Sequence, residues 1–314
     1  VEVLEKQGLF VPIPNDLIED IHSSRLDSEV LVFQSESSFI KQVGAISYRE
    51  IINFFRDIPS LVARIGITAF LNILYGLIFL KAGSRDNGNT DDFNTHVGAM
   101  SMLVIFALFG SGQSVLLAFP FERPMILREY VTGTYDIYSY FLSKVVVEIP
   151  VTFCQMLLQY IIAYFMMELQ GNFIFLVLVS WGLGMVSNSV AMGLGCLVPD
   201  VKDVTELAPL AYVPQILFAG FFIRTSQIPV FLRWAQYLCG MKYAMNLVLM
   251  TEFQTSRSDC SHSPEASANC HNVLSQNNID PKYFYIYIII LFAIFLGFRV
   301  LGGMILYQKA KRFY

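Results

Sequence analysis

Six long apolar stretches dominate the pattern of hydrophobic and polar positions along this chain. A transmembrane helix needs about 20 consecutive, mostly apolar residues. The stretches of about that length are Leu61–Leu80, Val97–Phe119, Ser139–Met167, Phe173–Val198, Leu207–Ile223 and Tyr283–Tyr307. Among them, Val97–Phe119 and Phe173–Val198 contain no charged residue over 23 and 26 positions. The pattern therefore predicts an all-α polytopic membrane protein, with six transmembrane helices in residues 58–314.

The segments before the first span are polar or amphipathic. Residues 1–37 are mixed in character, with Pro12, Pro14 and a group of serines, and we interpret them as a cytosolic linker. Within residues 38–57, apolar side chains recur near helical spacing between charged ones, which predicts an amphipathic helix in the membrane interface. An ordinary soluble surface helix is the alternative, but the span that follows at once favours the interface.

The last loop, residues 224–282, is long and contains a second apolar stretch, Ile228–Met250. Arg233 and Lys242 interrupt this stretch, and one basic residue at mid-bilayer costs at least about 2.5 kcal/mol. We therefore expect re-entrant or interfacial helices on the outer face of the protein. A seventh transmembrane span is the alternative.

Basic residues near the ends of the spans indicate the orientation, because short cytoplasmic loops carry an excess of Lys and Arg. One side of the predicted bundle carries Arg49, Arg56, Arg64, Arg123, Arg128, Lys144, Lys309, Lys311 and Arg312. On the other side, Lys81 and Arg85 lie beside three aspartates. This asymmetry places both termini in the cytosol and the long loop outside, with the plasma membrane as the expected location. A seventh span would place the two termini on opposite sides of the membrane.

Composition and missing motifs limit the classes of function. Hydrophobic residues make up 55% of the 314 residues and charged residues 15%, whereas soluble domains carry about 25% charged residues. The net charge of −4 gives no reason to expect a nucleic-acid partner. The sequence has no GxxxxGKS/T phosphate loop for ATP and no histidine inside a predicted span. We therefore expect no catalytic residue, metal site or cofactor in this chain.

Two of the five cysteines, Cys260 and Cys270, lie in a polar part of the last loop. An oxidising compartment favours a disulfide bridge between them. Free thiols and an intermolecular bond are alternatives, and zinc is a third because His262 and His271 lie nearby. The spacing of these residues fits no zinc template, however. We therefore predict an intramolecular Cys260–Cys270 bridge.

Between the second and third spans lies a charged, aromatic insert, Phe119–Pro150, which must lie at one membrane face. Its conspicuous residues are Glu122, Arg123, Pro124, Arg128, Glu129, Gly133, Tyr135, Tyr140, Lys144, Glu148 and Pro150. Their spacing resembles the G subfamily (White/pleiotropic-drug-resistance type) of ABC transporters. In that family the segment forms the coupling helix, here about residues 121–135, and the start of the third membrane helix.

The resemblance extends from about residue 40 to the C-terminus. Further matching positions are Ser47–Leu80, Phe218–Phe222, Ile228–Pro229, Trp234, Tyr237, Tyr243–Ala244 and Glu252–Phe253. One departure is large: half-transporters of this family carry an ATP-binding domain before this region, and the sequence contains none. Because it also lacks an initial Met and a signal-peptide pattern, we interpret it as a piece of a longer protein.

The resemblance implies that two six-helix units pack around a central cavity lined by the second and fifth spans. The residues it indicates are Phe106, Phe109 and Gln113 in the second span and Tyr212, Ile216 and Phe218 in the fifth. Together they would make a flat, aromatic slot suited to sterols, lipids or amphipathic drugs. The alternative is that these side chains belong to the core or face lipid. Phe221 and Phe222 match the hydrophobic plug that closes the outer exit.

Charged residues of the insert have implied roles as well. Glu122, Arg123, Arg128 and Glu129 would dock the ATP-binding domain or hold polar networks, with a solvated interface helix as the alternative. Lys144 and Glu148, one helical turn apart, either neutralise each other as a structural pair or belong to a polar relay. Arg299 in the last span either snorkels toward the C-terminal interface or faces the bundle.

The resemblance implies the membrane-spanning half of an ATP-driven exporter that moves lipids, sterols or amphipathic small molecules by alternating access. Its partners would be a second half-transporter, in a homodimer or heterodimer, and a nucleotide-binding domain that binds ATP and Mg²⁺. Two alternatives stay open: an ABC-2-type permease for a lipid-linked polymer with a separate ATPase subunit, and an energy-independent channel or scaffold. The insert argues against the channel, and the long loop with its cysteine pair argues against the permease.

Overall fold

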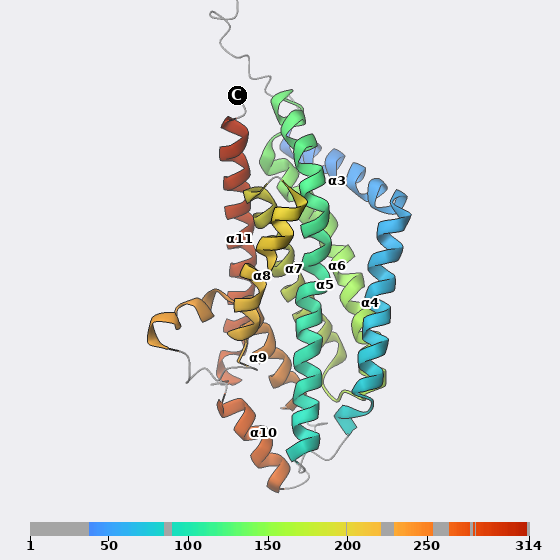
Figure 1. Ribbon diagram of the computed structural model, residues 1–314, viewed down its shortest axis with the longest axis vertical. Helices are drawn as coiled ribbons and strands as arrows, with labels where there is room; N and C mark the ends of the chain where they lie inside the picture. Colours follow the sequence, from blue (N-terminus) through green and yellow to red (C-terminus); the bar gives the residue numbers. More distant parts are fainter. Residues whose placement is uncertain are drawn as a thin grey trace, which may run out of the picture.

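The computed structural model describes residues 38–84, 90–198, 200–220, 229–253, 264–276, 279 and 281–312. These residues form helices and no strand, so the predicted all-α fold class is confirmed. The α-helices are α3 (Phe39–Arg56), α4 (Ile58–Ile78), α5 (Thr90–Val131), α6 (Ile137–Met167), α7 (Phe173–Leu197), α8 (Val201–Leu217), α9 (Gly240–Phe253), α10 (Pro264–Gln276) and α11 (Phe284–Arg312). Short 3₁₀ helices cover Ala82–Ser84, Val230–Leu232, Ala235–Leu238 and Pro281–Tyr283. Figure 1 shows the longest helices running roughly along the long axis of the molecule.

Five of the described helices, α4, α5, α6, α7 and α11, are long and apolar enough to cross a membrane. They coincide with five of the six predicted spans. The remaining span, predicted at Leu207–Ile223, overlaps α8, which begins at Val201 and has 17 residues; positions 221–223 lie outside the described residues. Helix α8 thus begins six residues before the predicted span, directly after Asp200.

Helix α5 contains both the second predicted span and much of the charged insert. It runs for 42 residues, through Pro120 and Pro124, to Val131. A helix of this length measures about 63 Å, whereas the hydrocarbon core of a bilayer is about 30 Å thick. The predicted coupling helix is therefore not a separate element: residues 121–131 are the last turns of α5. Residues 132–136 then turn into α6, with Gly133 in the left-handed region at φ 70°.

The amphipathic helix predicted for residues 38–57 is α3. Its buried side, which includes Ile46, Ser47 and Glu50, packs on α6. Asp57 then separates α3 from α4 and caps α4, because its side chain accepts a hydrogen bond from the Ser60 backbone N–H at 3.4 Å. The chain turns sharply at this point, so α3 crosses the end of the bundle at an angle to α4 (Figure 1).

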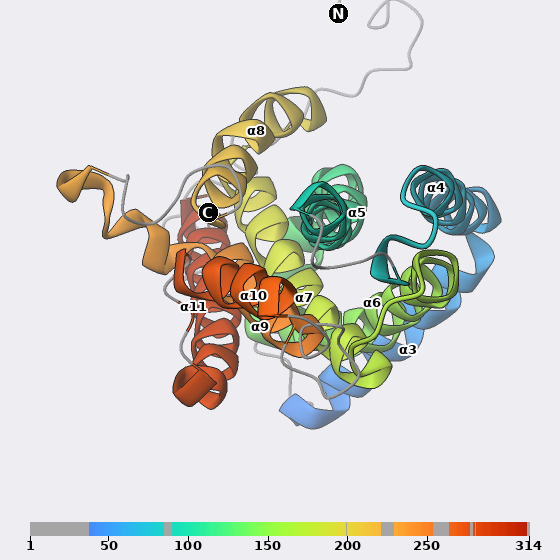
Figure 2. The ribbon, with the colours of Figure 1, turned by 90° about the horizontal axis from the view of Figure 1, so that it is seen from below.

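Helix α7 lies at the centre of the bundle and packs against α5, α6, α9 and α11 (Figure 2). Its buried residues include many small ones, such as Ser180, Gly184, Ser187 and Ala191. In lipid there is no hydrophobic driving force between helices, so small residues stabilise the contacts by letting backbones approach closely. The uncharged sequence of α7, apolar on all sides, is typical of such a central helix.

The second apolar stretch of the last loop ends in α9. This helix has 14 residues, about 21 Å of helix, which is too short to cross a core about 30 Å thick. Nearly all of its residues are buried, and it packs on α5, α7, α8 and α11. Within the described part of the chain, this stretch therefore contains no helix long enough to be a seventh transmembrane span.

A buried carboxylate joins three elements at the end of the bundle opposite α3. Glu252, near the C-terminal end of α9, is fully buried. It accepts hydrogen bonds from the backbone N–H groups of Gln170 and Gly171, both at 2.8 Å, in the hairpin between α6 and α7. His96 Nε2 on α5 lies 3.0 Å from the same carboxylate. These partners offset the cost of removing the carboxylate from water.

Replacing Glu252 by glutamine is expected to lower the free energy of unfolding by at least about 2 kcal/mol. The glutamine side chain has an NH2 group in place of one carboxylate oxygen. One of the groups that donate to Glu252 would therefore face another donor and lose its hydrogen-bond acceptor inside the core. The thermal unfolding midpoint of the purified protein in detergent measures the loss. Glu206→Gln on the exposed side of α8 is the matched control, and equal midpoints for the two variants would contradict the role of Glu252.

Candidate functional site

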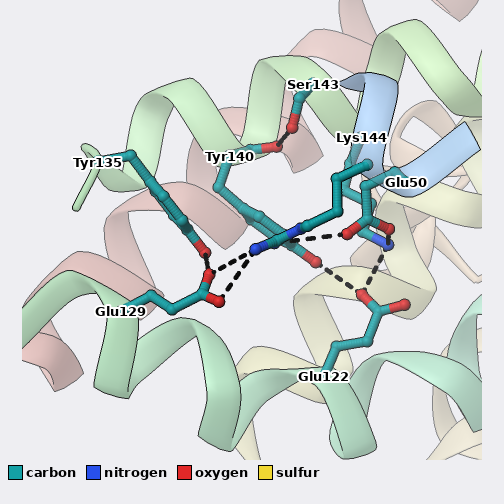
Figure 3. A network of polar contacts seen from close by, with 8 residues as sticks. Glu50, Glu122, Glu129, Tyr135, Tyr140, Ser143 and Lys144 are labelled. Carbon is teal, nitrogen blue, oxygen red and sulfur yellow. Dashed lines mark hydrogen bonds and ion pairs between the residues drawn. The ribbon is translucent and has the colours of Figure 1, made fainter. Parts of the chain in front are cut away.

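A network of charged and phenolic side chains joins α3, the last turns of α5 and the first turns of α6 (Figure 3). Arg49 on α3 donates from Nη1 to both carboxylate oxygens of Glu129 on α5, at 2.9 and 3.0 Å. The Tyr135 hydroxyl donates to Glu129 Oε2 at 2.6 Å. Because Tyr135 belongs to the turn before α6, this half of the network holds the turn against α3.

Lys144 on α6 forms the other half of the network. Its Nζ lies 2.7 Å from Glu50 Oε2 on α3 and 2.6 Å from Glu122 Oε2 on α5. The Tyr140 hydroxyl donates to the same Glu122 oxygen at 2.7 Å. Arg49 Nη2 lies 3.7 Å from Glu50 Oε1 and connects the two halves. All three helices are thus linked by ion pairs to one another.

The network is partly buried, so its charges interact more strongly than charges on an open surface. For Arg49, burial alone lowers the pKa, but the hydrogen bond and charge of Glu129 outweigh it and raise the pKa of the guanidinium. Burial and the Glu129 carboxylate raise the pKa of the Tyr135 phenol. The Tyr135 hydroxyl therefore stays protonated and remains a donor to Glu129.

A neutral contact adds to the connection between α3 and the start of α6. Gln42 Oε1 accepts hydrogen bonds from the Asp136 backbone N–H at 3.2 Å and from Ser139 Oγ at 2.9 Å. Gln42 lies seven residues before Arg49, on the same face of α3. Helix α3 therefore holds the turn between α5 and α6 at two levels along its length.

Glu148 pairs with Arg299 of α11, so the alternative in which Lys144 and Glu148 neutralise each other as a structural pair was wrong. Lys144 is engaged by the carboxylates of α3 and α5 instead. Arg299 is 7% exposed and faces the bundle, which is one of the two positions predicted for it. Its Nη1 also lies 2.8 Å from Met192 Sδ on α7. The pair connects α6 to α11 one turn further along α6 than the network.

The four predicted coupling residues of α5 occupy different environments. Glu122 and Glu129, seven residues apart on one face of the helix, both join the network. Arg123 is 5% exposed, and its Nε and Nη1 have no hydrogen bond within the described part of the chain. Arg128 is exposed.

Sequence reasoning did not select Arg49 and Glu50 as site residues. A signal for Glu50 was present, because it falls in phase with Val43 and Ser47 on the side of α3 that the structure buries. A charge on the buried side of an amphipathic helix needs a partner. That signal could not name the partner, since Lys144 lies 94 residues away in the sequence.

A cavity of about 1000 Å³ extends from this network between α4, α5 and α6. Phe106, Phe109 and Gln113, predicted for a substrate cavity, are among its lining residues. Its polar lining residues include Arg64, Thr68, Asn72, Thr152, Gln155, Gln159 and Asn188. Figure 2 shows α4 at the edge of the bundle beside α6. The volume is at the upper end of the range for small-molecule sites, about 300–1,000 Å³.

The predicted residues of the fifth span, on α8 and just after it, do not line this cavity. Tyr212 is 2% exposed, its hydroxyl donates to the Ser187 carbonyl at 3.2 Å, and its ring lies 5.4 Å from that of Phe109. Ile216 is partly buried against the core, and Phe218 follows the last residue of the helix. The Phe109–Tyr212 contact thus joins the two predicted helices by packing.

Gly112 allows this close packing of α5, α7 and α8. A Cβ atom at position 112 would collide with the Tyr212 hydroxyl and Ser187 Oγ. We expect Gly112→Ala to separate these helices and to lower the free energy of unfolding by about 1–3 kcal/mol, read from thermal unfolding in detergent. The control is Gly98→Ala on the same helix, where a Cβ meets no atom within 4 Å. An unchanged midpoint for Gly112→Ala would contradict the close approach.

Several predicted positions lie outside the described residues: Phe221, Phe222 and Cys260. Cys270 is 4% exposed on α10. Within the described ranges, no group of three His, Cys, Asp or Glu side chains is arranged to hold a metal ion.

Comparison with known families gives a match over residues 41–253, and the matching family is described as ABC-2 type transporter. The chain is also similar to curated proteins. It is 22% identical to ABC transporter G family member 1 of Dictyostelium discoideum, over 98% of this chain and 39% of that protein. It is 24% identical to ABC transporter G family member 4 of Arabidopsis thaliana, over 92% of this chain and 51% of that protein.

A third relative, ABC transporter G family member 38 of Arabidopsis thaliana, is 28% identical over 76% of this chain and 17% of its own length. The chain thus spans about half or less of the curated relatives it matches.

Proposed function

The chain belongs to the ABC-2 type transporter family, which matches residues 41–253, and on that premise we propose that it is the membrane-spanning half of an ATP-driven exporter. A nucleotide-binding domain outside this sequence binds ATP and Mg²⁺ and hydrolyses ATP. The exporter moves lipids, sterols or amphipathic small molecules by alternating access. It works as a homodimer or heterodimer with a second half-transporter. Both termini lie in the cytosol, and the plasma membrane is its location.

The three-helix network is the observation that carries this proposal. The last turns of α5 extend beyond the length that a bilayer covers and offer a surface on which a nucleotide-binding domain can dock. The pairs Arg49–Glu129 and Lys144–Glu122 connect these turns to α3 and α6. A push at the membrane face would therefore move the three helices as one body. A passive channel has no need of such a connection.

The cavity beside the network supports an amphipathic substrate. Aromatic side chains such as Phe106 and Phe109 line it together with aliphatic ones and a smaller number of amides and hydroxyls. Such a lining binds flat or flexible apolar molecules mainly through buried area, and the polar groups fix their orientation.

An exposed apolar face on α8 supports pairing with a second half-transporter. Leu210 is 74% exposed, Val213 45% and Leu217 39%. These residues recur at helical spacing on one side of α8. In the dimer they would pack against the partner, beside the central pathway predicted for the second and fifth spans.

Phe221 and Phe222 are proposed as the plug at the outer exit of that pathway. Paired bulky side chains from two subunits can close a pore by contact and by excluding water. We expect the Phe221→Ala/Phe222→Ala variant of the complete transporter to show a basal ATPase rate or a substrate leak at least about twofold above that of the parent. Unchanged ATPase and unchanged leak would remove the plug assignment.

The Cys260–Cys270 bridge remains a prediction that fits an extracellular position of the last loop. Peptide mapping under non-reducing conditions identifies it as a single linked peptide pair. Two free thiols at these positions would contradict it.

The complete transporter, reconstituted with its nucleotide-binding domain in proteoliposomes, tests the proposed function. A fluorescent phospholipid or sterol analogue should cross the bilayer with ATP and Mg²⁺ and stay in place without them. Replacing the phosphate-loop lysine of the nucleotide-binding domain is the control and should abolish movement. Equal movement with and without ATP would favour a channel. Movement of a lipid-linked polymer alone would favour the permease alternative.

A further inference from the structure

The cavity described above is bounded by α4 on one side and by α5 and α6 on the other, all within one chain. Part of its lining is also exposed at the outside of the bundle: Ile67 is 60% exposed and Leu117 42%. In a membrane these apolar side chains face acyl chains. The cavity is therefore open to the lipid phase between α4 and α5.

Arg64 is a cation that lines this cavity and has no acidic partner among the described residues. Its Nε donates to Gln155 Oε1 at 2.8 Å, and no ion pair links it to an acid among the described residues. It lies six residues after the start of α4, about 9 Å along the helix axis. A basic residue inside a span is costly unless it is paired, and it marks a functional site by default.

The acidic groups that line the same cavity are already engaged. Glu50 and Glu122 pair with Lys144, and Glu148 pairs with Arg299. Asp57 at the mouth is exposed and accepts the hydrogen bond of the α4 cap. The Nη groups of Arg64 therefore remain as donors for an anion that comes from outside the chain.

Two asparagines with buried amide oxygens line the cavity at a deeper level. Asn72 on α4 is 2% exposed and Asn188 on α7 is fully buried. Their Nδ2 groups donate to the Thr68 carbonyl at 2.7 Å and to Thr152 Oγ1 at 3.0 Å. Both Oδ1 atoms lack a hydrogen-bond donor within the described part of the chain. A hydroxyl group on a bound molecule would satisfy them.

We propose that this cavity binds a long-chain amphiphile with one acidic oxyanion headgroup, which enters from the adjacent leaflet. The headgroup binds the Arg64 guanidinium, whose planar donors suit carboxylate or phosphate oxygens. The apolar chain lies along Ile67, Leu71 and Phe106. Asn72 lies eight residues further along α4, about 12 Å deeper, so a hydroxyl in the middle of the chain reaches its free amide oxygen.

The choice of an amphiphile as the ligand rests on the proposed function, but the experiment that tests this site measures binding alone. The complete transporter is purified in neutral detergent, and equilibrium binding of radiolabelled stearate is measured. Unlabelled stearate should compete at least about tenfold better than methyl stearate, which lacks the charge. A stearate with a mid-chain hydroxyl should compete better than stearate itself.

Three variants assign the binding to these residues. Arg64→Gln should weaken stearate binding at least about tenfold, whereas Arg64→Lys should retain most of it. Arg56→Gln removes an exposed positive charge on α3 and is the matched control. Asn72→Leu should abolish only the advantage of the hydroxylated chain. The thermal unfolding midpoint of each variant is recorded, so that a folding defect is recognised.

Equal stearate binding by the parent and by a folded Arg64→Gln variant would overturn the proposal. Equal losses in Arg64→Gln and Arg56→Gln would also overturn it, because they would show a general effect of surface charge. ATP-driven transport is measured on the same preparations. If ATP-driven transport occurs but stearate binding does not depend on Arg64, the proposed binding site is wrong and the proposed function stands. If stearate binding depends on Arg64 but no ATP-driven transport occurs, the proposed function is wrong and the binding site stands.

Discussion

Replacing Arg299 by methionine while Glu148 stays in place is expected to lower the free energy of unfolding by about 3–5 kcal/mol. The two residues form an ion pair in which their side chains are only 7% and 12% exposed. Loss of Arg299 leaves the Glu148 carboxylate buried between helices without its countercharge. The same change also removes the contact of the guanidinium with Met192 and its position 5.8 Å from the Phe295 ring. Thermal or denaturant unfolding in detergent measures the loss.

A double variant separates the cost of an orphaned charge from the loss of packing. Glu148→Leu/Arg299→Met removes both charges and should recover most of the lost free energy, because a well-packed apolar pair often replaces a buried ion pair at little cost. Lys41→Met on the exposed side of α3 is the control for removal of a positive charge. A double variant that is no more stable than Arg299→Met would contradict the pairing.

Replacing Glu129 by glutamine is expected to reduce ATP-driven transport at least about tenfold while the protein stays folded. Coupling free energies between sites are typically about 1–3 kcal/mol, which corresponds to factors of about 5 to 150. Glutamine keeps the size of the side chain but loses the charge that holds Arg49 at 2.9 Å. In the proposed mechanism, α3 then no longer moves with the end of α5.

The loss in Glu129→Gln should appear in transport and not in folding. Loss of the Glu129 charge leaves the Arg49 guanidinium, whose side chain is 35% exposed, so the variant creates no buried orphan charge comparable to Glu148. Its unfolding midpoint should stay close to that of the parent, and the exposed Glu206→Gln variant should transport normally. A fall in the midpoint as large as that of Arg299→Met would show a structural defect instead.

Hydropathy was sufficient to predict most of the fold. The spans that became α4, α6, α7 and α11 agree with the structure to within a few residues, because a bilayer requires long apolar helices. The boundaries failed where polar residues continue a helix beyond the apolar stretch. Helix α8 starts at Val201, in a polar segment, and α5 continues through Pro120 and Pro124 to Val131. Hydropathy carries no information on such extensions.

The candidate site was predictable only in part, because residue spacing does not determine partners across the bundle. The family resemblance selected Glu122, Glu129 and Lys144, which do meet in the network. Helical spacing offered the near neighbour Glu148 as one possible partner of Lys144, whereas the closer acids in space come from α3 and α5. Arg64 was noted only as an orientation signal, since the absence of an acidic partner for it among the described residues is a property of the packed helices.

Exchange of the two charges that join α3 to α5 tests most directly whether the network transmits the motion driven by ATP. The measured quantity is the amount of lipid or sterol analogue moved per ATP hydrolysed by the complete transporter in proteoliposomes. Arg49→Glu and Glu129→Arg should each reduce this ratio at least about tenfold. The combined Arg49→Glu/Glu129→Arg variant should recover much of it, because the ion pair forms again with reversed sign. A ratio in the double variant as low as in the single variants, or single variants that couple as the parent does, would contradict transmission through this network.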